Sequence, residues 1–242
     1  MTRIYYGQAQ IEASVAAAFD QAVVAARKAG EWLNPRNGAQ RRDLLNLASG
    51  GESAQIRTAL QRYFGVNFPL SAADLQFVDR LGTVYRAMAT ALNVWTVHVS
   101  YADLADHDER EYASTRPPVI FPNAEGEVDT TNPNSFRATW AEVRANIDQG
   151  TRNYTFVHNL TPVIVNPATE LAYKIVLNSR FRNVSAFMKC ETVLHEMSHA
   201  LADTNDAAYA DDVATARQIC AVYGSAVARD TADCWGFFPM DW

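Results

Sequence analysis

The sequence has little of three things that mark particular protein classes: cysteine, long apolar runs and clustered positive charge. It contains three cysteines, and this odd number excludes a framework in which every cysteine is bridged. No apolar run reaches the length of a membrane span, so we expect no bilayer-spanning segment. The formal net charge is -6, from 21 Lys+Arg and 27 Asp+Glu, without a basic block, so we expect no nucleic-acid partner.

The N-terminal stretch MTRIYYGQAQ lacks the apolar centre of a signal peptide. Three explanations stay open: retention in the cell, export by a leaderless route, or a signal that was removed earlier. We expect secretion or leaderless delivery rather than residence in the cytoplasm. The chain has 242 residues, of which 48% are hydrophobic, and this suits one globular domain. We expect that domain to be a monomer.

Apolar residues at helical spacing dominate the first and the last third of the chain. They predict helices over 9–33, 39–49, 52–64, 72–92, 185–202 and 211–229, with Ser71 and Ser185 as N-caps. The middle third changes its period. The alternating run NVWTVHVSY (93–101) and the apolar run LAYKIVLN (171–178) predict strands.

Proline interrupts the apolar runs 117–122 and 161–167, which predicts edge or irregular strands. Polar, turn-rich stretches predict loops over 102–115 and 123–135, with a helix over 135–147. Together these elements predict a single-domain α+β fold that is mostly helical, with a small sheet containing antiparallel strands. Its three parts are a helical part over about 1–92, a strand and loop part over about 93–180, and a helical part over about 181–242.

The segment VLHEMSHALADTNDAAYA (193–210) carries the chemistry of the sequence. His195, Glu196 and His199 form the H-E-x-x-H pattern of zinc hydrolases. On a helix, positions i and i+4 lie on one face, so His195 and His199 can point both imidazoles at one ion. Glu196 lies about 100° around the helix axis, where it can reach a metal-bound water and act as general base. The pattern therefore predicts a Zn²⁺ site.

The third zinc ligand must come from another part of the chain. No histidine follows His199 and no glutamate follows Glu196, so a third histidine or a glutamate from a following helix is excluded. The carboxylates nearby are Asp203, Asp206, Asp211 and Asp212, with Glu191 one helical turn before His195.

The stretch HEMSHALADTNDAAYA resembles the aspzincin metallopeptidases, the family of deuterolysin and peptidyl-Lys endopeptidase. Their signature continues after H-E-x-x-H with G-T-x-D-x-x-Y-G. Thr204, Asp206 and Tyr209 match that second motif, whereas Asp203 and Ala210 stand where the family has glycine. The resemblance implies a zincin-like fold with the sheet over the active-site helix, Asp206 as third zinc ligand and Tyr209 as oxyanion donor.

Asp203 stays open as the rival ligand, because the chain from His199 to Asp206 is short and must leave the helix quickly. We expect Asn205 to take the left-handed conformation that this exit requires.

The C-terminal stretch ARDTADCWGFF (228–238) resembles the acidic-aromatic segment of the peptidyl-Lys members, with Asp230 and Asp233 in its acidic positions. The resemblance implies a pocket that accepts a lysine side chain and cleavage on the amino side of lysine. The alternative is that both are ordinary solvated aspartates. Nearby aromatic residues either wall the pocket or pack onto the core: Trp235, Phe237, Phe238 and Trp242.

These observations predict a zinc-dependent endopeptidase that cleaves protein or peptide substrates by attack of zinc-bound water. Two alternatives stay open. One is a narrow-specificity protease toxin or effector, suggested by the missing signal peptide and by residues 102–160, which match no part of the family. The other is a catalytically inactive zincin-fold binding module. The sequence also leaves open whether Cys220 and Cys234 are bridged.

Overall fold

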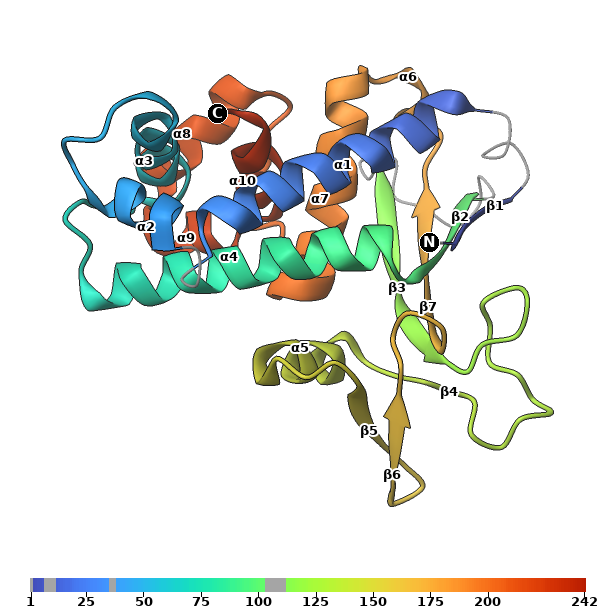
Figure 1. Cartoon of the computed structure of the whole chain (residues 1–242). Coiled ribbons are helices and arrows are strands. Elements are labelled where there is room, and N and C mark those ends of the chain that lie inside the picture. The colour runs from blue at the N-terminus through green and yellow to red at the C-terminus, as the bar shows by residue number, and fades with distance from the viewer. Residues whose placement is uncertain (1, 7–11, 35–37, 103–111) are drawn as a thin grey trace. The chain divides into compact units, whose positions relative to one another are not determined.

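The computed structural model describes residues 2–6, 12–34, 38–102 and 112–242 (Figure 1). The chain forms two compact units, each built from two stretches: 1–20 with 90–192, and 21–89 with 193–242. The chain passes between the units inside three helices, α1 (Ala13–Trp32), α4 (Ala72–Asn93) and α7 (Ala186–Ala202). The sequence-based division into three consecutive parts of one domain stays a prediction.

The first unit contains a five-stranded sheet in the order β1-β2-β7-β3-β4. Its strands are β1 (Thr2–Tyr5), β2 (Thr96–Tyr101), β7 (Leu171–Leu177), β3 (Ala113–Ile120) and β4 (Phe136–Arg137). The pairs β1–β2 and β2–β7 are parallel, whereas β3 is antiparallel to both β7 and β4. The predicted mixture of helices with a small, partly antiparallel sheet is therefore confirmed.

Strand β3 is irregular, as predicted, but it is not an edge strand, because it lies between β7 and β4. Its register against β7 shifts between Arg116 and Val119. Pro117 and Pro118 fall inside this shift, where their missing N–H groups break no regular ladder. The predicted loop 102–115 is wrong at its end, since β3 begins at Ala113; residues 103–111 of that loop lie outside the described residues.

The hairpin of β5 (Tyr154–His158) and β6 (Thr161–Val165) completes the strands of the first unit. The sequence did not indicate β1, β4 or β5; the residues of β4 lie in the helix predicted over 135–147. Helix α5 (Trp140–Gln149) begins later than predicted. Its start is fixed by a capping box in which Thr139 and Glu142 bond reciprocally to each other's backbone. A short helix, α6 (Arg180–Asn183), follows the sheet.

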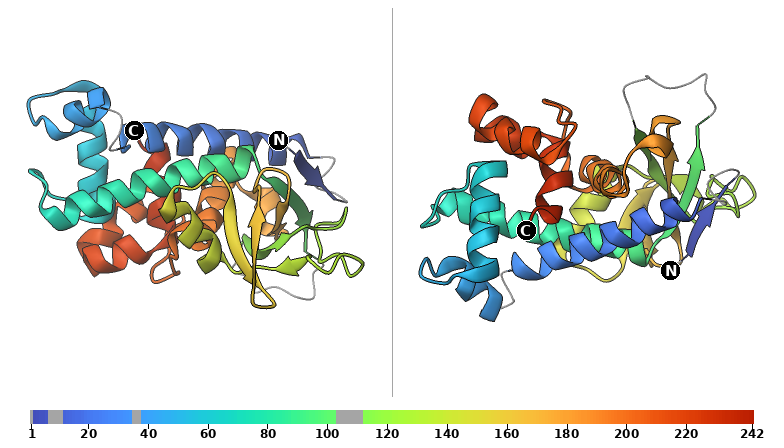
Figure 2. Two further views of the ribbon diagram at one scale, coloured as in Figure 1. Left: turned by 60° about the horizontal axis from the view of Figure 1, so that its bottom comes forward. Right: turned by 90° about the horizontal axis from the view of Figure 1, so that it is seen from above.

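Helices make up the second unit, and small shifts of their ends separate the observed helices from those predicted over 9–33, 39–49, 52–64, 72–92 and 185–202. They are α2 (Gly38–Leu45), α3 (Gly51–Phe64), α8 (Val213–Tyr223), α9 (Ser225–Asp230), α10 (Ala232–Phe237) and the 3₁₀ turn η2 (Phe238–Met240), with parts of α1, α4 and α7. Helix α3 packs against α8 and α9 (Figures 1 and 2). The single helix predicted over 211–229 is wrong: Gly224, with φ 87, separates α8 from α9. In the described part of the chain, no helix is long and apolar enough to cross a bilayer.

An aromatic cluster holds the C-terminal segment in the second unit. The ring of Trp235 lies 5.9 Å from that of Phe64 and 5.8 Å from that of Tyr85, centroid to centroid. Phe238 stacks on Tyr85 at 5.9 Å. The Tyr85 hydroxyl donates to the backbone carbonyl of Trp235 at 2.8 Å. Trp235 and Phe238 therefore pack into the core, and the segment just before them is anchored to α3 and α4.

This anchoring predicts the stability of a variant. Replacing Tyr85 with Phe keeps the ring but removes the donor to a buried carbonyl, which should lower the free energy of unfolding by about 1 kcal/mol or more. The matched control is Tyr223→Phe, because the Tyr223 side chain is 58% exposed; it should stay within about 0.5 kcal/mol of the parent. Urea unfolding measures both, and equal effects would contradict a buried anchor.

Candidate metal centre

Helix α7 positions the two histidines. The Ser185 side chain accepts from the backbone N–H of Met188 at 3.2 Å and caps the helix start. Cys190, Leu194, Met197 and Leu201 form an apolar stripe along the helix, and all are at most 3% exposed. Phe187 lies at the same helical spacing, one turn earlier, but is 37% exposed. The buried stripe fixes the rotation of α7 and leaves His195 and His199 on an adjacent face.

The helix ends at Ala202, and the next residue turns the chain. Asp203 has φ 65, the left-handed conformation, so the expectation that Asn205 would take it was wrong. Aspartate tolerates this conformation because its short side chain can bond locally to the backbone. Asp203 stands where the aspzincin signature has glycine, the residue that adopts this conformation most easily. Arg80 donates to the carbonyl of Ala202 at 2.8 Å and completes the helix end.

A short backbone bridge at Asn205 then sets the position of Asp206, the third candidate ligand. Asn205 pairs in parallel with Thr231: its N–H donates to the carbonyl of Asp230 at 2.7 Å, and its carbonyl accepts from Ala232 at 3.0 Å. The Asn205 side chain also donates to the Asp230 carboxylate, at 3.1 and 3.2 Å. These bonds hold the residue next to Asp206 on both sides of its backbone, which fixes where the Asp206 side chain starts.

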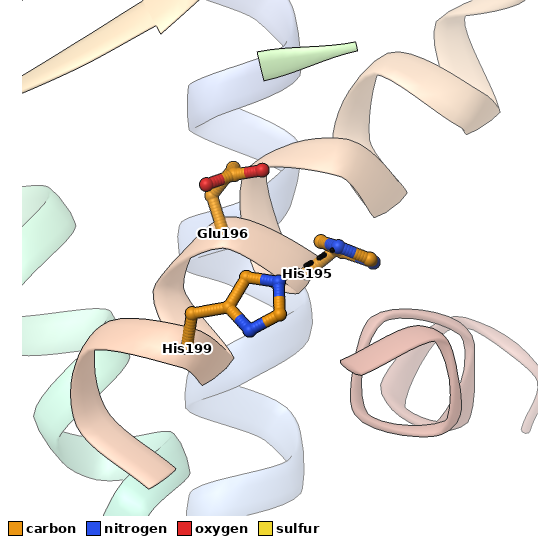
Figure 3. A group of neighbouring side chains, drawn as sticks. All are labelled: His195, Glu196 and His199. Carbon is orange, nitrogen blue, oxygen red and sulfur yellow. Dashed lines mark hydrogen bonds between the residues drawn. The ribbon is translucent and has the colours of Figure 1, made fainter. Parts of the chain in front are cut away.

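Three potential ligand atoms meet at this point. The Nε2 atoms of His195 and His199 lie 3.1 Å apart (Figure 3). Asp206 Oδ1 lies 3.2 Å from Nε2 of His195 and 3.3 Å from Nε2 of His199. Asp206, one of the two aspartates that the sequence left open, thus contacts both imidazoles through its carboxylate. Ligands about 2.0–2.1 Å from a tetrahedral zinc ion stand about 3.3–3.4 Å from each other, close to these separations.

Hydrogen bonds at the far side of each ring define which nitrogens carry protons. His199 Nδ1 lies 2.8 Å from the backbone carbonyl of Thr204, and a carbonyl only accepts, so this nitrogen carries the hydrogen. His195 Nδ1 lies 2.6 Å from Asp233 Oδ1, and an ionised carboxylate also only accepts. When both rings are neutral, each Nε2 atom therefore has no hydrogen and carries a lone pair. These lone pairs face one another and the Asp206 carboxylate.

This arrangement requires a positive charge between the three atoms. Burial raises the pKa of Asp206, but its hydrogen bonds with His195 and His199 lower it more, so the pKa lies well below the usual 3.8. Burial lowers the pKa of His199, but the bonds to Asp206 and to the Thr204 carbonyl, together with the charge of Glu196, outweigh it, so this pKa is raised above 6.5. A proton or a metal ion relieves the repulsion of the lone pairs. The residues present therefore fit a divalent metal.

Glu196 lies beside this triangle. Its side chain is 6% exposed, and its carboxylate and the imidazole nitrogens of His195 and His199 all lie within 4.8 Å of one another (Figure 3). Tyr209, the expected oxyanion donor, has a side chain that is 72% exposed. Its role stays a prediction.

The two aspartates expected in a lysine pocket have other contacts. Asp233 is 6% exposed; its Oδ1 contacts His195, and its Oδ2 accepts from the backbone N–H of Ala210 at 2.5 Å. Asp230 accepts from the Asn205 side chain. Sequence reasoning missed both contacts, and also missed Ser198, whose hydroxyl lies 2.7 Å from that of Thr204 and donates to the His195 carbonyl.

The cysteines take no part in this centre. Cys190, Cys220 and Cys234 are free thiols, so Cys220 and Cys234 are not bridged. Burial raises the pKa of Cys190 to about 12 and also raises that of Cys234. Because thiolates rather than thiols bind metals, both stay neutral side chains of the core at ordinary pH.

Comparison of the sequence with models of known protein families and with curated proteins found no match. The metal-binding interpretation therefore depends on the geometry of the side chains.

The protonation of His199 predicts how metal binding depends on pH. Its pKa is raised above 6.5 in the metal-free protein, and the proton must leave before Nε2 can bind a metal. Zinc affinity should therefore fall steadily as pH decreases through that raised pKa, by about tenfold per pH unit, and level off above it. Competition with a chromophoric chelator between about pH 5.5 and 8.5 measures this; a constant affinity would contradict it.

The two candidate aspartates can be separated by mutation. Asp206→Ala removes a carboxylate oxygen from the triangle and should weaken zinc binding by more than about 100-fold. The control is Asp203→Asn, because asparagine also tolerates the left-handed conformation and should leave zinc affinity nearly unchanged. Zinc titration of both variants decides between them, and the reverse ranking would make Asp203 the ligand.

Proposed function

We propose that this protein is a zinc-dependent endopeptidase. The observation that carries the proposal is the triangle of two histidine nitrogens and one aspartate oxygen, 3.1 to 3.3 Å on each side, with the carboxylate of Glu196 beside it. Two imidazoles and a carboxylate form a donor set that suits zinc. The resemblance of 195–210 to the aspzincin signature supports the same proposal and favours peptide bonds as the substrate.

A zinc ion in this centre would supply Lewis acidity, which lowers the pKa of a water molecule and polarises a peptide carbonyl. The chain's own residues supply the rest. Glu196, whose carboxylate is nearly buried, accepts the proton of the attacking water and then delivers it to the leaving amine. The phenol of Tyr209, in the role that the resemblance implies, donates to the developing oxyanion. Zincin-like architecture is part of this proposal.

The preference for lysine is a finer proposal, and the contacts bear differently on its two residues. A buried ammonium needs a paired carboxylate. Both oxygens of Asp233 already have partners in the protein, which counts against direct contact with a substrate. Asp230 is partly exposed and remains the better candidate. Mapping cleavage sites in a denatured protein mixture tests the preference.

Glu196→Gln tests the proposed reaction. The amide keeps the size of the side chain but cannot accept the proton, so kcat/KM for peptide cleavage should fall by about 10²–10⁴-fold with zinc content unchanged. The matched control is Glu52→Gln, since the Glu52 side chain is 41% exposed and pairs with Lys28. Full activity of the zinc-loaded Glu196→Gln variant would refute the role of Glu196.

The same assay separates the alternative functions. A wild-type protein that binds zinc but cleaves only a few members of a broad peptide panel would favour a narrow-specificity effector. A protein that binds no zinc and cleaves nothing would favour a binding module. Zinc content and cleavage are therefore measured on the same preparation.

A further inference from the structure

One carboxylate joins the two parts of the chain that supply the metal ligands. Asp233, in the first turn of α10, contacts His195 on α7 through Oδ1 at 2.6 Å. Its other oxygen, Oδ2, accepts from the backbone N–H of Ala210 at 2.5 Å. His195 supplies one candidate ligand nitrogen, and Ala210 ends the segment that carries Asp206 and Tyr209. Asp233 is 6% exposed, so little water competes for either bond.

We propose that Asp233 is a positioning residue of the metal centre. Its Oδ1 holds the hydrogen of His195 on Nδ1, so that Nε2 presents a lone pair to the metal. Its Oδ2 holds the 206–210 segment at a fixed distance from α7. This inference rests on the proposed function for the identity of the metal. In this proposal Asp233 acts by orienting His195, and it does not bind the ammonium group of a substrate lysine.

The two histidines differ in how they are oriented. His199 donates to a backbone carbonyl, that of Thr204, which any residue at 204 would provide. His195 donates to a side chain, and position 233 must supply its carboxylate. A carboxylate behind a ligand histidine fixes the tautomer and raises the basicity of the ring more than a neutral carbonyl does. A substitution at position 233 therefore removes the partner of His195, while His199 keeps its hydrogen bond to the Thr204 carbonyl.

The backbone around Asp233 is built to keep its carboxylate in place. The hydroxyl of Thr231, fully buried, donates to the carbonyl of Val227 at 2.8 Å. The indole N–H of Trp235 donates to the carbonyl of Arg229 at 2.9 Å, and its ring packs in the aromatic cluster. Asp233 thus lies between two anchored residues, as a residue that orients a ligand must.

Asp233→Asn is the informative variant, because it preserves shape while removing an acceptor. The amide offers one acceptor oxygen and one donor nitrogen, so it cannot accept from both His195 and Ala210. Either the segment is released, or His195 is driven toward the tautomer with hydrogen on Nε2. Zinc binding, measured by chelator competition, should weaken by about 10- to 100-fold.

Asp241→Asn is the matched control. Its side chain is 8% exposed, like that of Asp233, but its carboxylate pairs with Arg217 rather than with a histidine, so its change should alter zinc affinity by less than about threefold. Equal losses in both variants would mean that Asp233 only stabilises the fold. Unchanged zinc affinity in a folded Asp233→Asn protein would overturn the proposal.

A second measurement needs no variant. Ring-nitrogen chemical shifts of the zinc-free wild type, at about pH 8.5 where histidine is largely neutral, should show His195 with its hydrogen on Nδ1. Hydrogen on Nε2 would overturn the proposal even if the Asp233→Asn protein fails to fold. Neither readout uses peptide cleavage. If the wild type cleaves no peptide but shows this tautomer, and the Asp233→Asn variant binds zinc more weakly, the inference about Asp233 stands while the peptidase proposal fails.

Discussion

The structure depends on one electrostatic constraint: three electron-rich atoms held within 3.3 Å of each other. Lone pairs on two imidazoles and a carboxylate repel, and only a cation or a proton between them relieves the repulsion. Each ring is held in this orientation by a bond on its opposite side, to the Thr204 carbonyl and to Asp233. These contacts on the far side of each ring therefore hold the three atoms together, an arrangement that suits a metal ion.

Those contacts come from the helical unit. The left-handed turn at Asp203, the bridge between Asn205 and Thr231 and the aromatic packing of Trp235 all lie in residues 21–89 and 193–242. The ligands and the residues that orient them therefore belong to the same compact unit. The metal centre can be understood from the helical unit by itself.

Local patterns predicted the parts of the fold that depend on neighbouring residues. The serine caps at 71 and 185 are found as predicted, because a cap bonds within three residues of itself. The β2 and β7 strands were readable from alternating or continuous apolar residues. Two predictions were wrong because of a competing local choice: Gly224 divides one apolar helical run into two, and a register shift lets a proline-containing strand enter the sheet interior.

The sequence by itself was enough to predict that His195 and His199 lie side by side on a helix with Glu196 next to them, because residues one turn apart are neighbours on the helix surface. It also limited the downstream choices to aspartate. Only the tertiary structure brought the Asp206 carboxylate to both imidazoles, since that contact depends on where the chain turns and on which segment it then pairs with. The contact of Asp233 with His195 spans 38 residues. Such a contact exists only after two distant segments pack together, and no spacing rule along the chain encodes it.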